Sequence, residues 1–294
     1  MKSATIFAAV MLMFVMMLSA NSEPWKKSLD TDFTLTQNSY SDSWKGGEAG
    51  SISWVWNANG IFEKQVSPKF NYKNTSKLSF GQTHIQDKDT KEWAKPQKST
   101  DLIDIENLGR FTMGWVVDPY TAFRIETQFL DASDTLANKK LYFNPLKFTE
   151  SAGASRKFYG TEKTELLSRL GFAIRQIIAK TVIDTDGNTE SQTSNDGGFE
   201  SVTDLKMVLS ETLKYTSKLS LYKAIYYSKS DELKGQPNED YWKQVDVNWE
   251  NQVSASIVKY VTVSLYMQLL YDKEIDLKGR FKQTLALGLT YKLF

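Results

Sequence analysis

Apolar and polar side chains alternate strictly along the C-terminal part of the chain. The pattern runs through residues 241–259, 260–271 and 280–294. In the first of these stretches Val247 and Trp249 occupy one frame, while Asp246 and Asn248 occupy the other. Successive side chains of a strand point to opposite faces, so each stretch predicts a β-strand with one apolar and one polar face. A soluble sheet alternates in the same way, and the pattern alone leaves a soluble β-sandwich or large soluble barrel open.

The same pattern, followed along the whole chain, predicts twelve strands. Their expected bounds are residues 29–40, 50–66, 69–83, 100–117, 120–130, 149–159, 164–178, 198–215, 218–228, 241–259, 260–271 and 280–294. In the second strand Trp54 and Trp56 alternate with Ser53 and Asn57. An apolar frame beside a polar one predicts a sheet with an apolar outside and a polar inside.

Short and long connections alternate between these strands. The short ones follow the even-numbered strands, at Ser67-Pro68, Asp118-Pro119, 160–163, Thr216-Ser217 and Lys259-Tyr260, and the long ones follow the odd-numbered strands, at 41–49, 84–99, 131–148, 179–197, 229–240 and 272–279. An even strand count with short turns at one end and long loops at the other is typical of outer-membrane barrels. Unpaired backbone in lipid is costly, which favours a closed sheet. We therefore predict an all-β fold, a transmembrane antiparallel up-and-down β-barrel of about 12 strands.

Two stretches fit this scheme less well. Residues 164–178 also show a helical pattern, but a strand is preferred because it places Arg169 and Arg175 together on the inward face. In residues 198–215 the apolar frame carries Glu211 toward lipid. A bulge, or a position near the lipid headgroups, is needed there.

The N-terminus is interpreted as an export signal. Lys2 is followed by an uncharged apolar run over residues 4–20 and then by small and polar residues around Ser22. A basic start, an apolar centre and small residues near the cleavage point are typical of a secretory signal peptide. The alternative is an uncleaved membrane anchor, for which the apolar run is near the short limit. We expect a signal peptide over residues 1–22 and the barrel over residues 23–294.

Composition narrows the classes of partner. The 294 residues include 36 Lys and Arg against 35 Asp and Glu, and the mean hydropathy is -0.42. Near neutrality argues against a nucleic-acid partner, and the low hydropathy argues against a bundle of membrane helices. The 8 Trp, 14 Tyr and 16 Phe suit the aromatic girdles of a transmembrane barrel. The absence of cysteine excludes disulfides and thiolate metal sites.

Two segments resemble a known family. Gln37, Trp44, Gly46, Gly47 and Trp54 lie within QNSYSDSWKGGEAGSISW, and Asp101, Trp115, Gln128 and Phe129 lie within KSTDLIDIENLGRFTMGW and RIETQFLDAS. These residues are similar to those of an uncharacterised barrel family of Bacteroidota-type bacteria, domain of unknown function 3078, over residues 25–173. The family has no established activity. The resemblance therefore implies an outer-membrane location and carries over no functional residue.

Charged residues on the polar frames are the candidate functional residues. We expect the following to face the lumen: Asp104, Glu106, Arg110, Arg124, Glu126, Arg169, Arg175, Asp204, Lys206, Asp246 and Glu250. Twelve strands enclose a lumen wider than that of a filled eight-stranded barrel and narrower than that of a sixteen-stranded porin. Fixed charges in it select ions or sugars, which predicts a narrow passive channel for small hydrophilic solutes, with Arg110, Arg124, Glu126, Arg169 and Arg175 as its constriction. Paired across the lumen, the same charges would plug it instead, and the sequence leaves both hypotheses open.

Catalytic and metal-binding patterns are weak. Barrel enzymes of the outer membrane mostly rely on histidine, and the single histidine, His84, lacks a serine two residues later. Residues 184–188 carry alternating oxygen side chains, but the glycine is at the fourth position instead of the sixth, and Asn195 stands where a calcium loop has its glutamate. We expect no enzymatic activity, no cofactor and no metal.

The expected location is the bacterial outer membrane, with periplasmic termini and extracellular long loops. The terminal Phe294 on an amphipathic strand resembles the signal that such barrels present to the barrel-assembly machinery, although the apolar frame ends at Leu293. The expected partners are outer-membrane lipid, that machinery during insertion and, if the lumen is open, small hydrophilic solutes. The alternative to a channel is a non-conducting structural or interaction barrel that presents residues 131–148 and 179–197 to other outer-membrane proteins.

Overall fold

Most of the residues described by the computed structural model, 24–41 and 49–292, are in β-strands. The long strands are β1 (Lys26–Asn38), β2 (Ser51–Ser67), β3 (Phe70–Ile85), β4 (Gln97–Arg110), β5 (Asp118–Thr127), β8 (Leu146–Gly160), β9 (Thr164–Val182), β10 (Thr189–Val208), β11 (Leu213–Tyr227), β12 (Val245–Val258), β13 (Val261–Tyr271) and β14 (Arg280–Lys292). The short elements are β6 (Leu130–Asp131), β7 (Leu141–Tyr142) and two 3-10 turns, η1 (Ser230–Leu233) and η2 (Tyr241–Lys243). Within the described ranges, no helix is long and apolar enough to cross a membrane.

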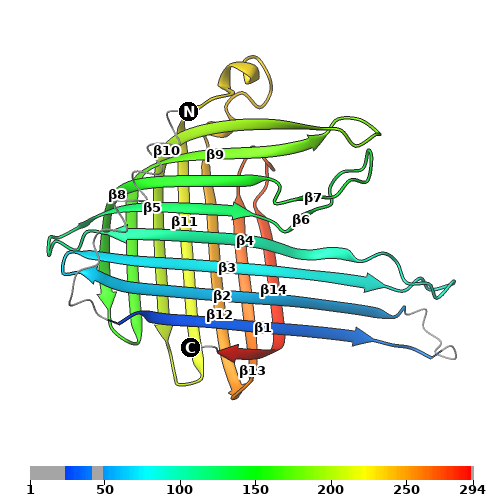
Figure 1. Ribbon diagram of the computed structural model, residues 1–294, viewed down its shortest axis with the longest axis horizontal. Helices are drawn as coiled ribbons and strands as arrows, with labels where there is room; N and C mark the ends of the chain where they lie inside the picture. Colours follow the sequence, from blue (N-terminus) through cyan, green and yellow to red (C-terminus); the bar gives the residue numbers. More distant parts are fainter. Residues whose placement is uncertain (1–23, 42–48, 293–294) are drawn as a thin grey trace.

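The twelve long strands form one closed ring. Their order is β1-β14-β13-β12-β11-β10-β9-β8-β5-β4-β3-β2, and β14 pairs with β1 to complete it (Figure 1). All neighbours along the ring are antiparallel. β6 and β7 pair only with each other, inside the loop that joins β5 to β8. The predicted twelve-stranded antiparallel up-and-down barrel is confirmed.

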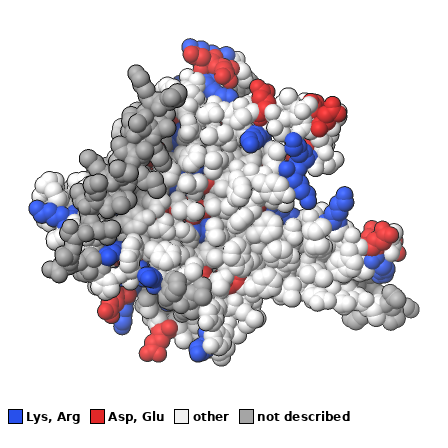
Figure 2. All heavy atoms as spheres, in the orientation of Figure 1, with Lys and Arg blue, Asp and Glu red and all other residues white. Residues whose placement is uncertain are grey.

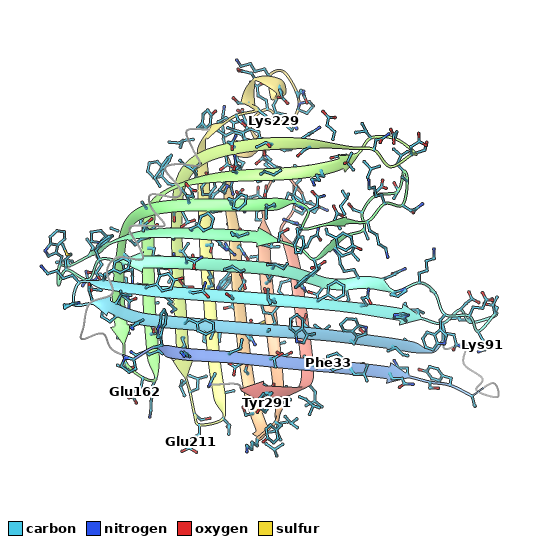
Figure 3. All side chains as sticks on the ribbon, in the orientation of Figure 1. Phe33, Lys91, Glu162, Glu211, Lys229 and Tyr291 are labelled. Atoms are coloured by element: carbon cyan, nitrogen blue, oxygen red, sulfur yellow. The ribbon has the colours of Figure 1, made fainter. Side chains whose placement is uncertain are left out.

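The two ends of the barrel carry different connections. One end, the turn end, has residues 68–69, 111–117, 161–163, 209–212 and 259–260. The other, the loop end, has the remaining connections, including the β6-β7 sheet. Figure 3 shows Glu162 and Glu211 toward one end and Lys91 and Lys229 toward the other. The predicted separation of short turns from long loops is present for most connections; the exception is that residues 111–117 at the turn end form a longer connection than residues 183–188 at the loop end.

The turn between β10 and β11 differs from the prediction. It lies at residues 209–212, so the turn predicted at Thr216-Ser217 is wrong. The Ser210 hydroxyl accepts a hydrogen bond from the backbone N–H of Leu213, and this local contact turns the chain early. Glu211 therefore lies in the turn instead of facing lipid, and the bulge required by the sequence interpretation is not needed.

The connection between β4 and β5 also differs. β4 ends at Arg110, residues 111–117 form the connection, and the turn predicted at Asp118-Pro119 is wrong because these residues begin β5. The Asp118 side chain accepts a hydrogen bond from the backbone N–H of Met113, which holds the connection in its turned form. The apolar side chains of residues 111–117 therefore continue the alternating pattern without continuing the strand.

The predicted loop 179–197 is mostly strand. β9 and β10 stay paired up to Val182↔Thr189, so the connection is only residues 183–188. Polar segments form a strand ladder through the same backbone hydrogen bonds as apolar segments. The polarity of residues 179–197 therefore predicts a longer loop than the structure has. The alternative helix for residues 164–178 is excluded, because β9 covers them as a strand.

The outer surface of the barrel is apolar. On β14 the outward side chains of Leu285 and Leu289 are 70% and 65% exposed, and on β9 Leu170 is 64% exposed. Charged side chains gather mainly toward the ends of the molecule, with uncharged surface between them (Figure 2). Stacked rings of Tyr260 and Tyr291 stand near the turn end, 6.3 Å apart. These features match the apolar band and aromatic girdle expected of a barrel in lipid.

Some predictions fall outside the described residues. The signal peptide over residues 1–22, part of the family motif at Trp44, Gly46 and Gly47, and the terminal Phe294 are among them. They stay predictions.

Candidate functional site in the lumen

Strand alternation directs charged side chains into the barrel. Asp104 and Glu106 share the inward frame of β4, and Arg169 and Arg175 share that of β9. Asp104 is 4% exposed and Arg169 1% exposed. Charges shielded from water in this way need partners of opposite sign. The inward frames of β4 and β9 therefore require a set of ion pairs.

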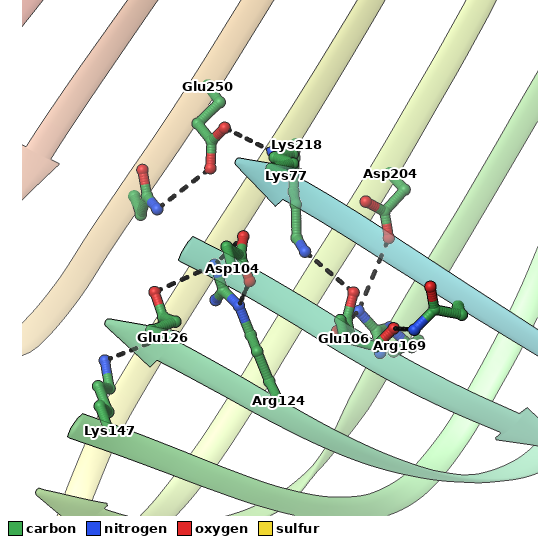
Figure 4. Close-up of polar contacts among 12 residues, drawn as sticks. Lys77, Asp104, Glu106, Arg124, Glu126, Lys147, Arg169, Asp204, Lys218 and Glu250 are labelled. Atoms are coloured by element: carbon green, nitrogen blue, oxygen red, sulfur yellow. Dashed lines mark hydrogen bonds and ion pairs between the residues drawn. The ribbon is translucent and has the colours of Figure 1, made fainter. Parts of the chain in front are cut away.

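Two of these ion pairs cross the lumen. Lys77 Nζ on β3 lies 2.7 Å from Glu250 Oε2 on β12, and Lys218 Nζ on β11 lies 3.0 Å from Glu106 Oε2 on β4 (Figure 4). β3 and β12 are five places apart in the ring of twelve, and so are β4 and β11. Side chains from nearly opposite walls are therefore in direct contact, and the lumen is bridged at this level. We call these two contacts the central bridges.

Arg124 fastens the wall beside the central bridges. Its Nε lies 2.7 Å from Asp104 Oδ1 and its Nη2 lies 2.9 Å from Asp104 Oδ2. The same guanidinium lies 3.1 Å from Glu126, which Lys147 approaches to 3.4 Å from the next strand. Two parallel N–H···O bonds between a guanidinium and a carboxylate fix orientation as well as charge. Arg124 is therefore held in one position instead of swinging freely in the lumen.

Arg169 fastens the opposite side of Glu106. Its Nη2 donates to Glu106 Oε1 at 2.7 Å and lies 3.7 Å from Asp204. Its guanidinium also lies 5.6 Å from the centre of the Tyr120 ring. Glu106 thus accepts from Arg169 and Lys218 with its two oxygens, and this single carboxylate joins β4, β9 and β11.

Further ion pairs lie inside the barrel on both sides of the central bridges, toward the loop end and toward the turn end. Toward the loop end, Arg175 is 2.7 Å from both Asp196 and Asp246, and its guanidinium lies 3.6 Å from the centre of the Tyr222 ring. Toward the turn end, Lys73 lies 3.1 Å from Glu165. A buried apolar cluster also fills the inside near the turn end; it consists of Leu108, Tyr120, Ala122 and Leu167. The interior is therefore filled by side chains at several levels along its axis.

Among the described residues, a cavity lies on the loop side of the central bridges. Its volume is about 220 Å³, and its lining includes Arg124, Glu126, Arg175, Lys218, Asp246 and Arg280. A water molecule takes up roughly 30 Å³, so the cavity holds a few waters or one small group of a solute. A second hollow, of about 410 Å³, lies against Trp25, Phe62 and Tyr72 on the outer surface and is separate from the lumen.

Residues 35–132 match the family described as "Protein of unknown function (DUF3078)". The match covers 98 of the 294 residues, from β1 to the beginning of the β5-β8 loop. It confirms the resemblance to DUF3078 over this segment, whereas the restriction to Bacteroidota-type bacteria stays a prediction.

Solved structures similar to the DUF3078-matching chain are outer-membrane barrels. The translocator domain of the autotransporter NalP from Neisseria meningitidis has 9% identity and a TM-score of 0.37, and covers 98% of this chain and 97% of its own. An outer-membrane channel from Pseudomonas putida F1 has 10% identity and a TM-score of 0.42, with coverage of 94% and 97%. The channel DcaP of Acinetobacter baumannii has 6% identity and a TM-score of 0.30, with coverage of 92% and 96%. No curated protein matches the chain.

Three of the residues that carry the DUF3078 resemblance, Asp101, Gln128 and Phe129, meet at the loop end. The Asp101 carboxylate accepts hydrogen bonds from the backbone N–H groups of Phe129 and Leu130, at 2.6 and 2.9 Å. Gln128 accepts a hydrogen bond from Lys98 and donates one to the backbone of Asn144. With its side chain 1% exposed, Asp101 anchors the beginning of the β5-β8 loop to β4. These residues hold a loop in place and do not line the lumen network.

Most of the predicted lumen residues belong to the ion pairs described above. They are Asp104, Glu106, Arg124, Glu126, Arg169, Arg175, Asp204, Asp246 and Glu250. Arg110 stands apart at the turn end, where it donates to Asn71 at 3.1 Å and lies 3.9 Å from Asp118. Lys206 is exposed, and among the described residues no carboxylate lies within ion-pair distance of it. The part that these residues play in solute selection stays a prediction.

Sequence reasoning missed both lysines of the central bridges. The turn predicted at Thr216-Ser217 makes Lys218 the first residue of the next strand, whereas β11 already begins at Leu213. Lys77 lies on β3 in the polar frame, opposite an outward frame with Phe70, Leu78 and Phe80 that is interrupted by Asn74 and Ser76. The spacing of Lys73 and Lys77, four residues apart on one strand, was the available signal, since residues at even spacing share a face.

The two remaining chemical candidates are Asp184 in its loop and His84 on β3. Both carboxylate oxygens of Asp184 accept bonds from Asn188, one from its backbone and one from its side chain. These bonds lower the pKa of Asp184 and engage both oxygens inside the loop. No cluster of metal-ligating residues occurs in the part of the chain that the structure describes. His84 lies near the loop end of β3, and among the described residues it has no hydrogen bond or ion pair with a serine or a carboxylate.

Proposed function

We propose that this protein is an integral outer-membrane barrel whose lumen is closed along its axis by side-chain ion pairs, so that it does not conduct in this conformation. The central bridges, Lys77 to Glu250 and Lys218 to Glu106, carry the proposal because they join nearly opposite walls directly. This is the non-conducting alternative that the sequence left open.

The outward frames support insertion into a membrane. Leu285, Leu287 and Leu289 are 70%, 61% and 65% exposed on one strand alone. Apolar surface in water is unfavourable by about 25 cal/mol per Å², and soluble monomers rarely expose contiguous apolar patches above a few hundred Å². Lipid offers no hydrogen bonds to the backbone, and a closed sheet pairs its strands around most of its circumference, which satisfies the backbone groups internally. We place the loop end outside the cell and the turn end in the periplasm.

Burial supports the closure. The Glu106 side chain is 12% exposed, that of Lys218 11% and that of Arg169 is fully buried. Separating a buried ion pair leaves an uncompensated charge, which costs about 3–5 kcal/mol. Salt in the medium screens such pairs much less than it screens surface pairs. We therefore expect the bridges to stay closed over a wide range of ionic strength.

A narrow channel for small hydrophilic solutes is the second candidate. The observation that favours it is the accessibility of one bridge, since the side chain of Lys77 is 27% exposed. Water that reaches this pair brings ions, and in this candidate the bridges form a constriction that a passing ion displaces. Arg124 and Arg175 then set the ion selectivity.

Single-channel recording in a planar bilayer tests the proposal. We expect refolded, heat-modifiable wild-type protein to give no conductance steps. The Lys77→Ala, Lys218→Ala double variant removes both central bridges and should give discrete steps. Reproducible steps from the wild type would overturn the closed lumen in favour of the channel. In that case Arg124→Ala and Arg175→Ala must change the reversal potential in a salt gradient, or the proposed constriction is wrong as well.

A further inference from the structure

The seam between β1 and β14 is paired over only part of its length. Among the described residues the ladder ends at Phe33↔Leu289 on its loop-end side. β13 and β14, by contrast, stay paired up to Arg280. Residues 34–38 of β1 and 280–288 of β14 therefore share no ladder, although both segments are strand. We call this stretch the unpaired seam.

The exposure of the side chains on β14 agrees with the missing ladder between β1 and β14. Toward the loop end of β14, Phe281 and Leu285 are exposed on the outward frame, and Lys282 and Thr284 are exposed on the inward frame. Where a wall is continuous, as on β9, outward Leu170 is exposed while inward Arg169 and Ala173 are buried. Figure 1 shows β14 upright over most of its length, with its last residues turned along β1. The two strands thus come together near the turn end and separate toward the loop end.

The inward frame beside the unpaired seam carries two cations without a carboxylate. Lys282 Nζ has a hydrogen bond to Thr100 Oγ1 at 3.2 Å, and no acidic side chain lies within ion-pair distance of it among the described residues. Arg280 Nε is buried and, in the same part of the chain, has no hydrogen-bond partner. The central lysines Lys77 and Lys218 each have a glutamate. Arg280 also lines the cavity of about 220 Å³, so that cavity adjoins the seam.

We infer that the unpaired seam is a lateral portal for a single-chain amphipathic anion, a fatty carboxylate, whose head lies between Arg280 and Lys282 and whose tail passes Leu35 and Leu285 into the bilayer. Unpaired backbone N–H groups in lipid need acceptors, and a carboxylate accepts from them and from both cations. The outer lip is apolar: Leu35 is 58% exposed, Leu285 70% and Leu287 61%. The inference rests on the proposed membrane insertion and closed lumen, because a barrel closed along its axis exchanges solutes only sideways.

Binding of dodecanoate to the protein in phosphatidylcholine nanodiscs tests the portal. Titration calorimetry, corrected with empty nanodiscs, compares dodecanoate with acetate, which lacks the tail, and with dodecyltrimethylammonium, which lacks the anionic head. We expect saturable binding of dodecanoate only. The Arg280→Gln, Lys282→Gln double variant should bind about tenfold more weakly or worse, because it loses two charge-assisted hydrogen bonds. Lys163→Gln, which removes an exposed cation at the turn end, should bind like the wild type.

Three results would overturn the portal. Equal uptake of dodecyltrimethylammonium would mean simple partition into lipid. Unchanged dodecanoate binding by the double variant, with its heat-modifiable fold intact, would remove the head-group site. Loss of dodecanoate binding in nanodiscs that also contain phosphatidylglycerol would mean that bilayer lipid, and not a free acid, occupies the seam. Failure here leaves the closed lumen untouched, because conductance measures that property separately.

Discussion

At the scale of single residues, the barrel depends on carboxylates shared between cations. Glu106 is the clearest example, because its two oxygens serve Arg169 and Lys218 from different walls. Neither cation is more than 11% exposed. Changes at this one position therefore act on three strands.

Replacing Glu106 by glutamine should destabilise the barrel strongly. The amide keeps the shape of the side chain but leaves Lys218 without its carboxylate and Arg169 with only Asp204, 3.7 Å away. We expect a loss of about 3–5 kcal/mol in the free energy of unfolding. Urea unfolding in lipid vesicles, followed by tryptophan fluorescence, measures it. Glu162→Gln, at an exposed turn position, is the matched control and should change little. Equal stability of the two variants would show that the network is not needed for folding.

Glu274 should make stability depend on pH near neutrality. Its side chain is exposed at the loop end, but the protein around it in the barrel mouth removes part of its hydration. This desolvation, together with the carboxylates of Asp272 and Asp246, raises the pKa of Glu274 to about 7 from the ordinary 4.5. Between these two values the unfolded chain releases the proton first, so the contribution of Glu274 to stability falls as pH rises through this window. Glu274→Gln should lose this dependence. The measurement is urea unfolding of both proteins at pH 5, 6, 7 and 8; parallel curves would contradict the prediction.

At the scale of elements, the two frames of each strand meet different solvents. Leu170 on β9 points outward between the inward positions 169 and 171, because successive residues of a strand lie on opposite faces of the sheet. The same rule explains Glu211, whose apparent lipid-facing position disappears once the turn is placed at residues 209–212.

A charge on the outward frame should be far less tolerated than one in the turn. Leu170→Arg places a cation against lipid near the middle of β9 and should cost about 2–4 kcal/mol. Glu211→Lys changes charge by two units in an exposed turn and should cost little. Folding yield into vesicles, scored by heat modifiability, compares the two. Similar yields would argue that the surface around Leu170 faces water.

Asp101 should control the order of the β5-β8 loop. Its two oxygens hold the N–H groups of Phe129 and Leu130, and Asp101→Ala leaves both donors without acceptors, at a local cost of about 1–3 kcal/mol. We expect faster proteolytic cleavage between residues 128 and 146 in intact cells. Asp87→Ala, which disturbs only the β3-β4 loop, is the control and should leave this cleavage unchanged.

At the scale of the whole molecule, closure depends on contacts between opposite walls and not on any one strand. Lys77 and Glu250 are far apart in sequence and are joined only because the ring places β3 nearly across from β12. The seam between β1 and β14 is the counterpart, since there the ring itself is incompletely paired.

Exchanging the charges of one central bridge should separate electrostatic closure from steric blockage. Lys77→Glu alone places two carboxylates together and should produce conductance steps where the wild type gives none. Adding Glu250→Lys restores an opposite pair and should silence the barrel again. Planar-bilayer recording of the three proteins is the measurement. Steps that persist in the double variant would mean that side-chain shape, and not charge pairing, closes the lumen.

The sequence by itself determined the twelve strands, the antiparallel barrel and the side to which most charges point, because alternation follows from the covalent geometry of a strand and is written into each segment separately. It identified Glu106, Arg124 and Arg169 as inward but left Lys77 unassigned, although Lys77 stands in the polar frame of β3. Only the tertiary structure decided which charges touch. Contact between β3 and β12, or β4 and β11, depends on strand order and register around the closed ring, and the unpaired seam depends on how far the first and last strands stay together. These relations join residues far apart in the chain, and no local pattern specifies them.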